Sequence, residues 1–325
     1  MAKKYPKISI VIPLYVKTPY FFESVEGCLE LDYPNYEILV GIDKPLSIEL
    51  GNKKIKLFKT QKKRTGPAEK RDICIRNATG EYIAFLDDDS YPAKDWLKKA
   101  ITHIKRKKVS SVCGPGITPP KDSFSQKLTG AILSSPFGSG PYAYRFSPKE
   151  PRYVDDYPAY NMIVRKKTLI DVGGFGTTYY GGEDTALCLK LVRAGEKIYY
   201  HPDIVVYHHR RSFPNEYAKQ VGNVGMHRGY FVKKYPQTSL RFSYFAPAII
   251  LLSIPVLIFV LLIFPQLLVS FCLVAIFIYL IIFFEAISRE GPIFSAILPI
   301  AVLANYIFYG QQFIKGLLFT HTLKR

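Results

Sequence analysis

The sequence predicts an α/β domain with a mostly parallel, Rossmann-like sheet, followed by C-terminal transmembrane helices. In the first 113 residues, short apolar runs alternate with segments of helical character, which is typical of a parallel sheet covered on both faces. Near the C-terminus, the 43 residues 242–284 carry no charge and are almost all apolar. Because one helical span needs about 20 residues, this stretch is long enough for two.

The elements of the N-terminal domain follow from apolar runs and from helix-start signals. Pro67 suits the first turn of a helix over 67–78, where its missing N–H costs nothing. Residues 115–160 are rich in Pro, Gly, Ser and Tyr without a period, and we interpret them as a long loop over the acceptor side of a site. The predicted strands are 8–12, 36–42, 54–58, 82–86 and 109–113, and the other predicted helices are 21–31 and 92–104.

The C-terminal region divides at Phe264-Pro-Gln266 into two expected transmembrane helices, 243–264 and 267–284. A third uncharged stretch, 292–314, contains three amide side chains and could cross the membrane or lie in its interface. Lys315, Lys324 and Arg325 follow it, and positive residues prefer the cytosol. The expected domains are therefore an α/β domain over 1–212, a juxtamembrane or interfacial segment over 213–241 and a membrane domain over 242–325.

The net charge of +18 indicates an anionic partner. Only five Lys or Arg and two Asp or Glu lie from Arg241 onward, so the excess belongs to the domain beside the membrane. Anionic lipid headgroups are favoured, and nucleic acid is not expected because no nucleic-acid-binding motif is present. Five scattered cysteines without a CxxC pair and an N-terminus without a signal-peptide core predict a cytosolic domain on a multi-pass protein of the cell membrane.

Carboxylates follow two of the predicted strands. Asp43 follows the strand 36–42, and three consecutive aspartates, Asp87, Asp88 and Asp89, follow 82–86. Ligands of α/β sheets bind beyond the carboxyl ends of the strands. Adjacent carboxylates repel unless a cation joins them, and Mg²⁺ or Mn²⁺ bound to a diphosphate would do so. The alternative is a solvated turn that caps the helix expected near Pro92.

Several motifs, in family order and spacing over about residues 8–211, make the chain resemble family 2 glycosyltransferases. The resemblance implies a GT-A fold, a nucleotide-diphosphate sugar donor, and a single displacement with inversion at the anomeric carbon. The motifs are Gly66-Pro-Ala-Glu-Lys-Arg71, Gly80-Glu-Tyr-Ile-Ala-Phe-Leu-Asp-Asp-Asp89, Trp96-Leu97, Val172-Gly-Gly-Phe175, Gly182-Glu-Asp184 and Tyr207-His208.

The resemblance also implies roles for individual residues. Asp184 matches the general base, Asp89 the direct ligand of a Mn²⁺ or Mg²⁺ ion, and His208 the histidine that completes the metal and diphosphate site. Asp43 matches the carboxylate that holds the donor's base or ribose, and Asp87 is shared between metal and donor. The remaining residues expected to contact the donor are Pro13, Arg71 and Asp88.

Simpler interpretations exist for three of these residues. Asp184 could be an N-cap of the helix that follows it, and Asp43 an ordinary turn residue. Strand alternation allows only one of His208 and His209 to point inward. The adjacent Arg210 and Arg211 could contact the donor diphosphate or face lipid headgroups.

The chain departs from the family pattern at Asp72, where an asparagine is usual, and after Asp43, where Lys-Pro-Leu-Ser replaces a second acid and glycine. The Gln-x-x-Arg-Trp motif of processive synthases is absent, since the single tryptophan is Trp96. We therefore expect one sugar to be added per encounter, with a lipid-linked saccharide as the hypothetical acceptor. A polyprenyl-phosphate sugar synthase and a non-catalytic nucleotide-sugar-binding subunit are the alternatives.

Overall fold

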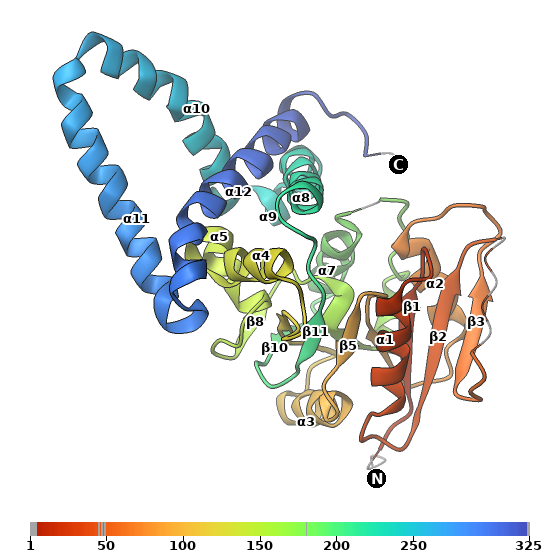
Figure 1. The fold of residues 1–325 in the computed structure, drawn as a ribbon. Coiled ribbons are helices and arrows are strands. Elements are labelled where there is room, and N and C mark those ends of the chain that lie inside the picture. Colours follow the sequence, from red (N-terminus) through yellow and green to blue (C-terminus); the bar gives the residue numbers. More distant parts are fainter. Residues whose placement is uncertain (1–4, 45, 47, 49, 180, 324–325) are drawn as a thin grey trace. The chain divides into compact units, whose positions relative to one another are not determined.

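The computed structural model describes residues 5–44, 46, 48, 50–179 and 181–323, and the chain forms two compact units (Figure 1). Of the described residues, those in 5–119 and 147–209 form the first unit and those in 120–146 and 210–323 form the second. Residues 1–4, on which the expectation of a cytosolic domain partly depends, lie outside the described residues, as do Lys324 and Arg325.

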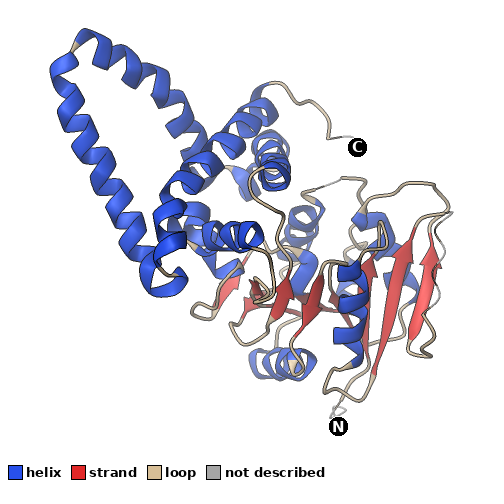
Figure 2. Cartoon of the chain, viewed as in Figure 1, coloured by secondary structure: helices blue, strands red, loops and turns tan. Residues whose placement is uncertain are grey.

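The first unit is built on a mixed sheet (Figure 2). Among the described residues it has eight strands in the order β3-β2-β1-β4-β9-β6-β10-β8. The strands β3, β2, β1 and β4 are parallel, β9 is antiparallel to both of its neighbours, and β10 is again parallel to β6. Their bounds are β1 (Ile8–Pro13), β2 (Tyr36–Ile42), β3 (Ile55–Lys59), β4 (Tyr82–Phe85), β6 (Ser111–Cys113), β8 (Arg152–Val154), β9 (Met162–Arg165) and β10 (Ile198–Tyr200).

The strand sequences explain this architecture. Every residue of β1, β2 and β4 is buried, as expected for strands covered on both faces, which lack an alternating polar pattern. The mostly parallel α/β fold expected from the sequence is confirmed. A second, smaller sheet has the strand order β5 (Ser90–Pro92), β11 (Val206–His208) and β7 (Gly116–Ile117). In the sequence, β5 follows shortly after β4.

The predicted helices 21–31, 67–78 and 92–104 are each found, with different bounds, whereas the helix over Lys166–Asp171 was not predicted. Residues 92–104 were expected to be helical, but α3 begins at Trp96 with Asp95 as its N-cap. The reason is that Ser90–Pro92 pairs with β11 as a strand, so the chain is still extended at Pro92. The helices are α1 (Pro19–Leu29), α2 (Pro67–Asn77), α3 (Trp96–Lys107), α6 (Lys166–Asp171) and α7 (Glu183–Arg193), with the 3₁₀ turn η2 (Ala159–Asn161).

The second unit is helical. Its elements are α4 (Phe124–Ser134), α5 (Pro136–Ser139), η1 (Gly140–Arg145), α8 (Asn215–Lys234), α9 (Pro236–Ser239), α10 (Phe242–Ile263), η3 (Pro265–Leu267), α11 (Leu268–Glu290) and α12 (Pro292–Leu318). The interpretation of 115–160 as a loop is wrong, because α4 lies inside it. The signal was a capping box, in which Ser123 accepts from the Gln126 backbone and Gln126 accepts from the Ser123 backbone.

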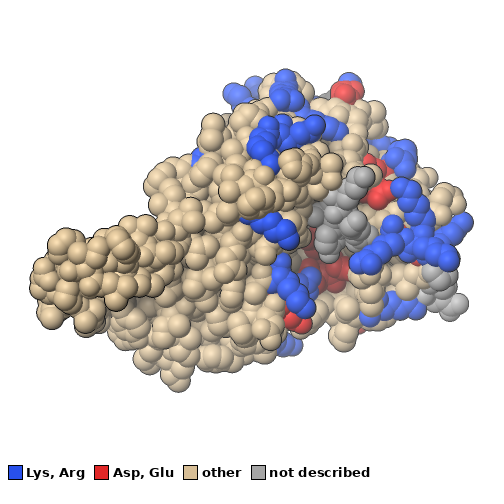
Figure 3. All heavy atoms as spheres, turned by 90° about the horizontal axis from the view of Figure 1, so that it is seen from above, with Lys and Arg blue, Asp and Glu red and all other residues tan. Residues whose placement is uncertain are grey.

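Three helices among the described residues are long and apolar enough to cross a membrane by length and composition: Phe242–Ile263, Pro265–Glu290 and Pro292–Leu318. In the most apolar 18 residues of each helix, 6% are buried in the first two and 44% in the third. The face shown in Figure 3 includes a broad area without Lys, Arg, Asp or Glu, in keeping with the uncharged stretch 242–284. The third helix packs closely on α8, because a Cβ at Gly225 would lie 2.4 Å from the Tyr309 carbonyl oxygen.

Candidate active site

The sheet register brings the predicted donor residues to one edge. Pro13 is the last residue of β1 and pairs with Gly41 of β2, and Val11 pairs with Phe85, the last residue of β4. Asp43 and Asp87 each lie within two residues of those positions along their own strands. The carboxyl ends of three parallel strands therefore present Pro13, Asp43 and Asp87 at the same edge of the sheet.

Arg71 joins the aspartate run to the Glu-Asp motif. From α2, its Nη2 donates to Asp87 Oδ1 at 2.6 Å, and its Nη1 donates to Asp184 Oδ1 at 3.1 Å and Glu183 Oε1 at 3.3 Å. The arginine is 2% exposed, and the three acids raise its pKa. Residues separated by more than 100 positions in the sequence thus meet around one buried guanidinium.

The two acids of α7 hold their protons more tightly than ordinary carboxyls. Burial raises the pKa of Asp184, and the Arg71 guanidinium opposes this only in part. Burial and the neighbouring Asp184 raise the pKa of Glu183 to about 7. The N-cap of α7 is Gly182, with φ of 78°, so the alternative that Asp184 serves as the N-cap is wrong. A carboxylate of raised pKa in the first turn of α7 is suited to accept a proton.

Asp89 and His208 form the second half of the site. His208 Nε2 lies 3.0 Å from Asp89 Oδ1, because β11 pairs with β5 and places His208 opposite Ser90. His208 points into this cluster, whereas His209 bonds Glu23 at 2.8 Å and stacks on Tyr20. The two side chains therefore contact different partners, although both are buried.

The residues present fit a divalent cation. One ligand atom from each of Asp87, Asp89 and His208 lies within 4.8 Å of the others. Two carboxylate oxygens and an imidazole suit Mn²⁺, and Mg²⁺ through the carboxylates.

Asp43 is held more firmly than the sequence indicated. Its carboxylate accepts from Thr60 Oγ1, from the Thr65 hydroxyl and backbone N–H, and from Lys70 Nζ at 2.9 Å. Burial alone would raise the pKa of Asp43, but the bonds from Thr65 and Lys70 outweigh it and lower the pKa. Lys70, which the motif analysis did not single out, is 2% exposed and belongs to this corner of the site.

Asp72, where the family usually has asparagine, accepts two backbone hydrogen bonds from the loop at Phe175 and Gly176. One carboxylate oxygen accepts from the Phe175 N–H and the other from the Gly176 N–H, each at 2.9 Å. Gly174 and Gly176 have positive φ, so the loop takes a conformation that other residues seldom adopt. An asparagine offers only one acceptor oxygen and could satisfy only one of these N–H groups.

Asp88 lies at the rim of the site, where its Oδ2 accepts from the Tyr15 N–H at 3.3 Å. This bond ties the aspartate run to the segment that follows β1 and Pro13. The run itself is held by Ser90, which donates to the Asp87 carbonyl oxygen and accepts from the Asp87 N–H.

The sequence matches the family described as glycosyl transferase family 2 over residues 9–173, which is just over half of the chain. The chain therefore belongs to glycosyl transferase family 2 and is a glycosyltransferase. The GT-A fold expected from the resemblance is also confirmed.

Among named relatives, the chain is 28% identical over 327 residues to a *Methanococcus voltae* protein, spanning 96% of this chain and 97% of that protein. That protein is called dolichyl N-acetyl-alpha-D-glucosaminyl phosphate 3-beta-D-2,3-diacetamido-2,3-dideoxy-beta-D-glucuronosyltransferase. The pre-mycofactocin glycosyltransferase of *Mycobacterium tuberculosis* is 31% identical over 148 residues, covering 45% of this chain and 31% of that protein.

A solved structure of similar fold is the mannosyltransferase PcManGT from *Pyrobaculum calidifontis*, in complex with GDP-Man and Mn²⁺. The TM-score is 0.60 at 17% identity, over 94% of this chain and 87% of that one. At this identity the likeness shows the fold alone.

Proposed function

We propose that this protein is a metal-dependent, inverting, membrane-bound glycosyltransferase. It transfers one sugar from a nucleoside diphosphate sugar to a hydroxyl group of a lipid-linked saccharide. The observation that carries the proposal is the convergence of Asp184, Arg71 and Asp87 with Asp89 and His208 at one sheet edge. Arg71 links Asp184, a candidate base, to Asp87 of the cation-binding residues. A displacement with a diphosphate leaving group requires both a base for the attacking hydroxyl and positive charge for the diphosphate.

Asp184 takes the proton of the acceptor hydroxyl as its oxygen attacks the anomeric carbon. Arg71 holds Asp184 Oδ1 in place at 3.1 Å, and burial keeps the carboxylate basic. Glu183 lies on the same guanidinium nitrogen, and its Oε2 accepts from the Gly181 N–H, so it positions the loop that carries the base. Inversion follows if the oxygen attacks opposite the leaving diphosphate in a single step.

Asp87, Asp89 and His208 would hold the Mn²⁺ or Mg²⁺ ion, which supplies charge stabilisation to the departing diphosphate when bound. Arg71 contributes a fixed positive charge beside Asp87. Asp88 and Pro13 border the donor on the β1 side.

Asp43 and Lys70 form the nucleoside end of the donor site. Because the Asp43 carboxylate already accepts four hydrogen bonds, a hydroxyl or base N–H of the donor has to replace one of them. The hydrogen bonds from Thr60 and Thr65 are the ones that the donor replaces most easily, because these residues are neutral. The bond from Lys70 is charge-assisted and therefore stronger.

The acceptor assignment rests on the three apolar helices and on the relative from *Methanococcus voltae*, whose name describes a dolichyl phosphate-linked acceptor and which aligns along almost its whole length. A multi-pass membrane domain would hold the first unit at the cytosolic surface, where basic side chains meet anionic headgroups.

Transfer assays on detergent-purified protein test this function. Lipid-linked and soluble saccharides are compared as acceptors with UDP-, GDP- and dTDP-sugars in Mn²⁺. We expect turnover on the lipid-linked acceptor, and loss of about 10²–10⁴-fold in Asp184→Asn with donor binding retained. The matched control is Asp171→Asn, an exposed aspartate paired with Lys167, which should keep full activity.

Two results would contradict the proposal. Equal turnover on soluble and lipid-linked saccharides would exclude the lipid-linked acceptor. Full activity of Asp184→Asn on a polyprenyl phosphate would show that the acceptor needs no base, because a phosphate oxygen is already deprotonated, and would favour a polyprenyl-phosphate sugar synthase.

A further inference from the structure

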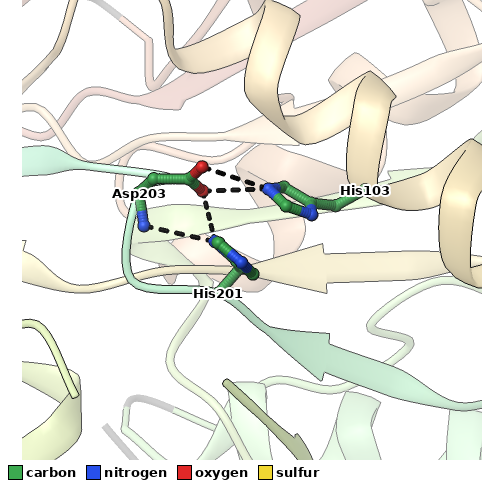
Figure 4. A group of neighbouring side chains, drawn as sticks. All are labelled: His103, His201 and Asp203. Atoms are coloured by element: carbon green, nitrogen blue, oxygen red, sulfur yellow. Dashed lines mark hydrogen bonds and ion pairs between the residues drawn. The ribbon is translucent and has the colours of Figure 1, made fainter. Parts of the chain in front are cut away.

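A second cluster of ligating side chains lies outside the site described above (Figure 4). His103 comes from α3, and His201 and Asp203 come from the segment that joins β10 to β11. One ligand atom from each lies within 4.8 Å of the others. The histidines are 98 positions apart in the sequence, so only the tertiary fold brings them together.

The two imidazoles converge on one carboxylate. His103 Nε2 lies 3.0 Å from Asp203 Oδ1 and 3.2 Å from Oδ2, and His201 Nδ1 also contacts Asp203 Oδ1. The rings are stacked, with centroids 3.7 Å apart. The Asp203 backbone N–H lies 3.4 Å from His201 Nδ1. Both imidazoles therefore direct a ring nitrogen at the same carboxylate, and a proton on His201 Nδ1 or a cation in its place would join that nitrogen to the carboxylate.

The cluster is only partly buried, and its exposure increases from His103 to Asp203. The side chain of His103 is 7% exposed, that of His201 20% and that of Asp203 36%. Three protein ligands with one open direction is the arrangement in which water completes a four-coordinate ion.

We propose that His103, His201 and Asp203 form a second metal site, which binds Zn²⁺ and ties the end of α3 to the segment between β10 and β11. Two imidazoles and one carboxylate are typical Zn²⁺ ligands, whereas Mg²⁺ prefers oxygen. Ligand atoms around a tetrahedral Zn²⁺ are about 3.3 Å apart. The Asp203 carboxylate would therefore withdraw from His201 by about 1 Å to admit the ion.

The site has a structural consequence for catalysis. β11 begins three residues after Asp203 and carries His208. An ion at Asp203 would fix the start of this strand against α3, and would hold His208 in register with β5. The zinc site shares no residue with the catalytic cation site, so the two can be emptied separately.

Zinc binding is measured by equilibrium dialysis and metal analysis of EDTA-treated, full-length protein in detergent. The His208→Ala variant is the starting protein, because it removes a ligand of the catalytic site. We expect it to bind one equivalent of Zn²⁺ that 100-fold excess Mn²⁺ does not displace. Adding His201→Gln or Asp203→Asn should remove this equivalent. Adding His321→Gln, at an exposed histidine outside the cluster, should leave it.

Thermal unfolding of the same proteins supplies a second readout. Zn²⁺ should raise the Tm of His208→Ala and of the His321→Gln control, but not of the His201→Gln or Asp203→Asn combinations. Retained Zn²⁺ binding in both of those combinations would overturn the proposal, as would failure of His208→Ala to bind Zn²⁺. Co²⁺ gives an independent signal, since only a tetrahedral site yields its intense visible absorption.

Discussion

Arg71→Gln is the substitution that most directly tests how the active site is held together. The guanidinium is 2% exposed and contacts Asp87, Glu183 and Asp184 at 2.6–3.3 Å. Removing one partner of a buried ion pair costs about 3–5 kcal/mol, because the remaining charge is left uncompensated. Three acids share this partner, so we expect a loss at the upper end of that range.

Thermal unfolding in detergent measures this loss. One kcal/mol shifts Tm by about 2–4 °C in a domain of 150–250 residues, so Arg71→Gln should lower Tm by roughly 10–20 °C. Adding Glu183→Gln should restore part of the loss, since one uncompensated charge is removed. The matched control is Lys62→Gln, whose ion pair with Glu69 is 2.9 Å long but exposed, and which should cost under about 1 kcal/mol.

The reasoning is refuted if Arg71→Gln unfolds within about 2 °C of the wild type. It is also refuted if the costs of Arg71→Gln and Glu183→Gln simply add, because residues in one charge network should not be independent.

Three further predictions concern stability. Asp72→Asn should lose the bond to one loop N–H and about 1–3 kcal/mol, measured by urea unfolding, whereas Asp72→Glu offers two oxygens and should lose less if its length is tolerated. The raised pKa of Glu183 means that the folded state binds a proton more tightly than the unfolded state. Stability should therefore fall as pH rises from about 4.3 through about 7, and Glu183→Gln should flatten this part of a Tm-versus-pH curve. Gly225→Leu should force α8 from α12, because its Cβ would meet the Tyr309 carbonyl at 2.4 Å, and should cost about 1–3 kcal/mol in Tm assays; a wild-type Tm would contradict the close packing.

Much of the fold was predictable because it depends on local patterns. The strands β1, β2 and β4 are mainly apolar. Asp43 follows β2 and Asp87 follows β4, so a parallel register alone brings these acids to one edge. The positions of β9 and β8 were not predictable, since antiparallel insertion into a parallel sheet leaves no local signal. The helix α4 was missed although Ser123 and Gln126 form a recognisable capping box.

The site shows a similar division. Family motifs supplied Asp89, Asp184 and His208, but not what holds them. The role of Arg71 as a shared partner of three acids depends on α2 and α7 meeting across more than 100 residues of sequence. The ion pair of Lys70 with Asp43 could not be predicted from local sequence either. It forms because the turn between β3 and α2 folds back on the end of β2.

The central claim, a cation-dependent nucleoside diphosphate site at this sheet edge, is tested most directly by a thermal-shift panel. Purified protein is heated with UDP, GDP, dTDP or CMP, each with and without Mn²⁺, beside the Asp89→Ala variant. A ligand at 100 times its Kd adds about 2.7 kcal/mol to stability. We predict a shift for one diphosphate that requires Mn²⁺ and disappears in Asp89→Ala. No shift with any nucleotide, or a shift that Asp89→Ala retains, would contradict the account.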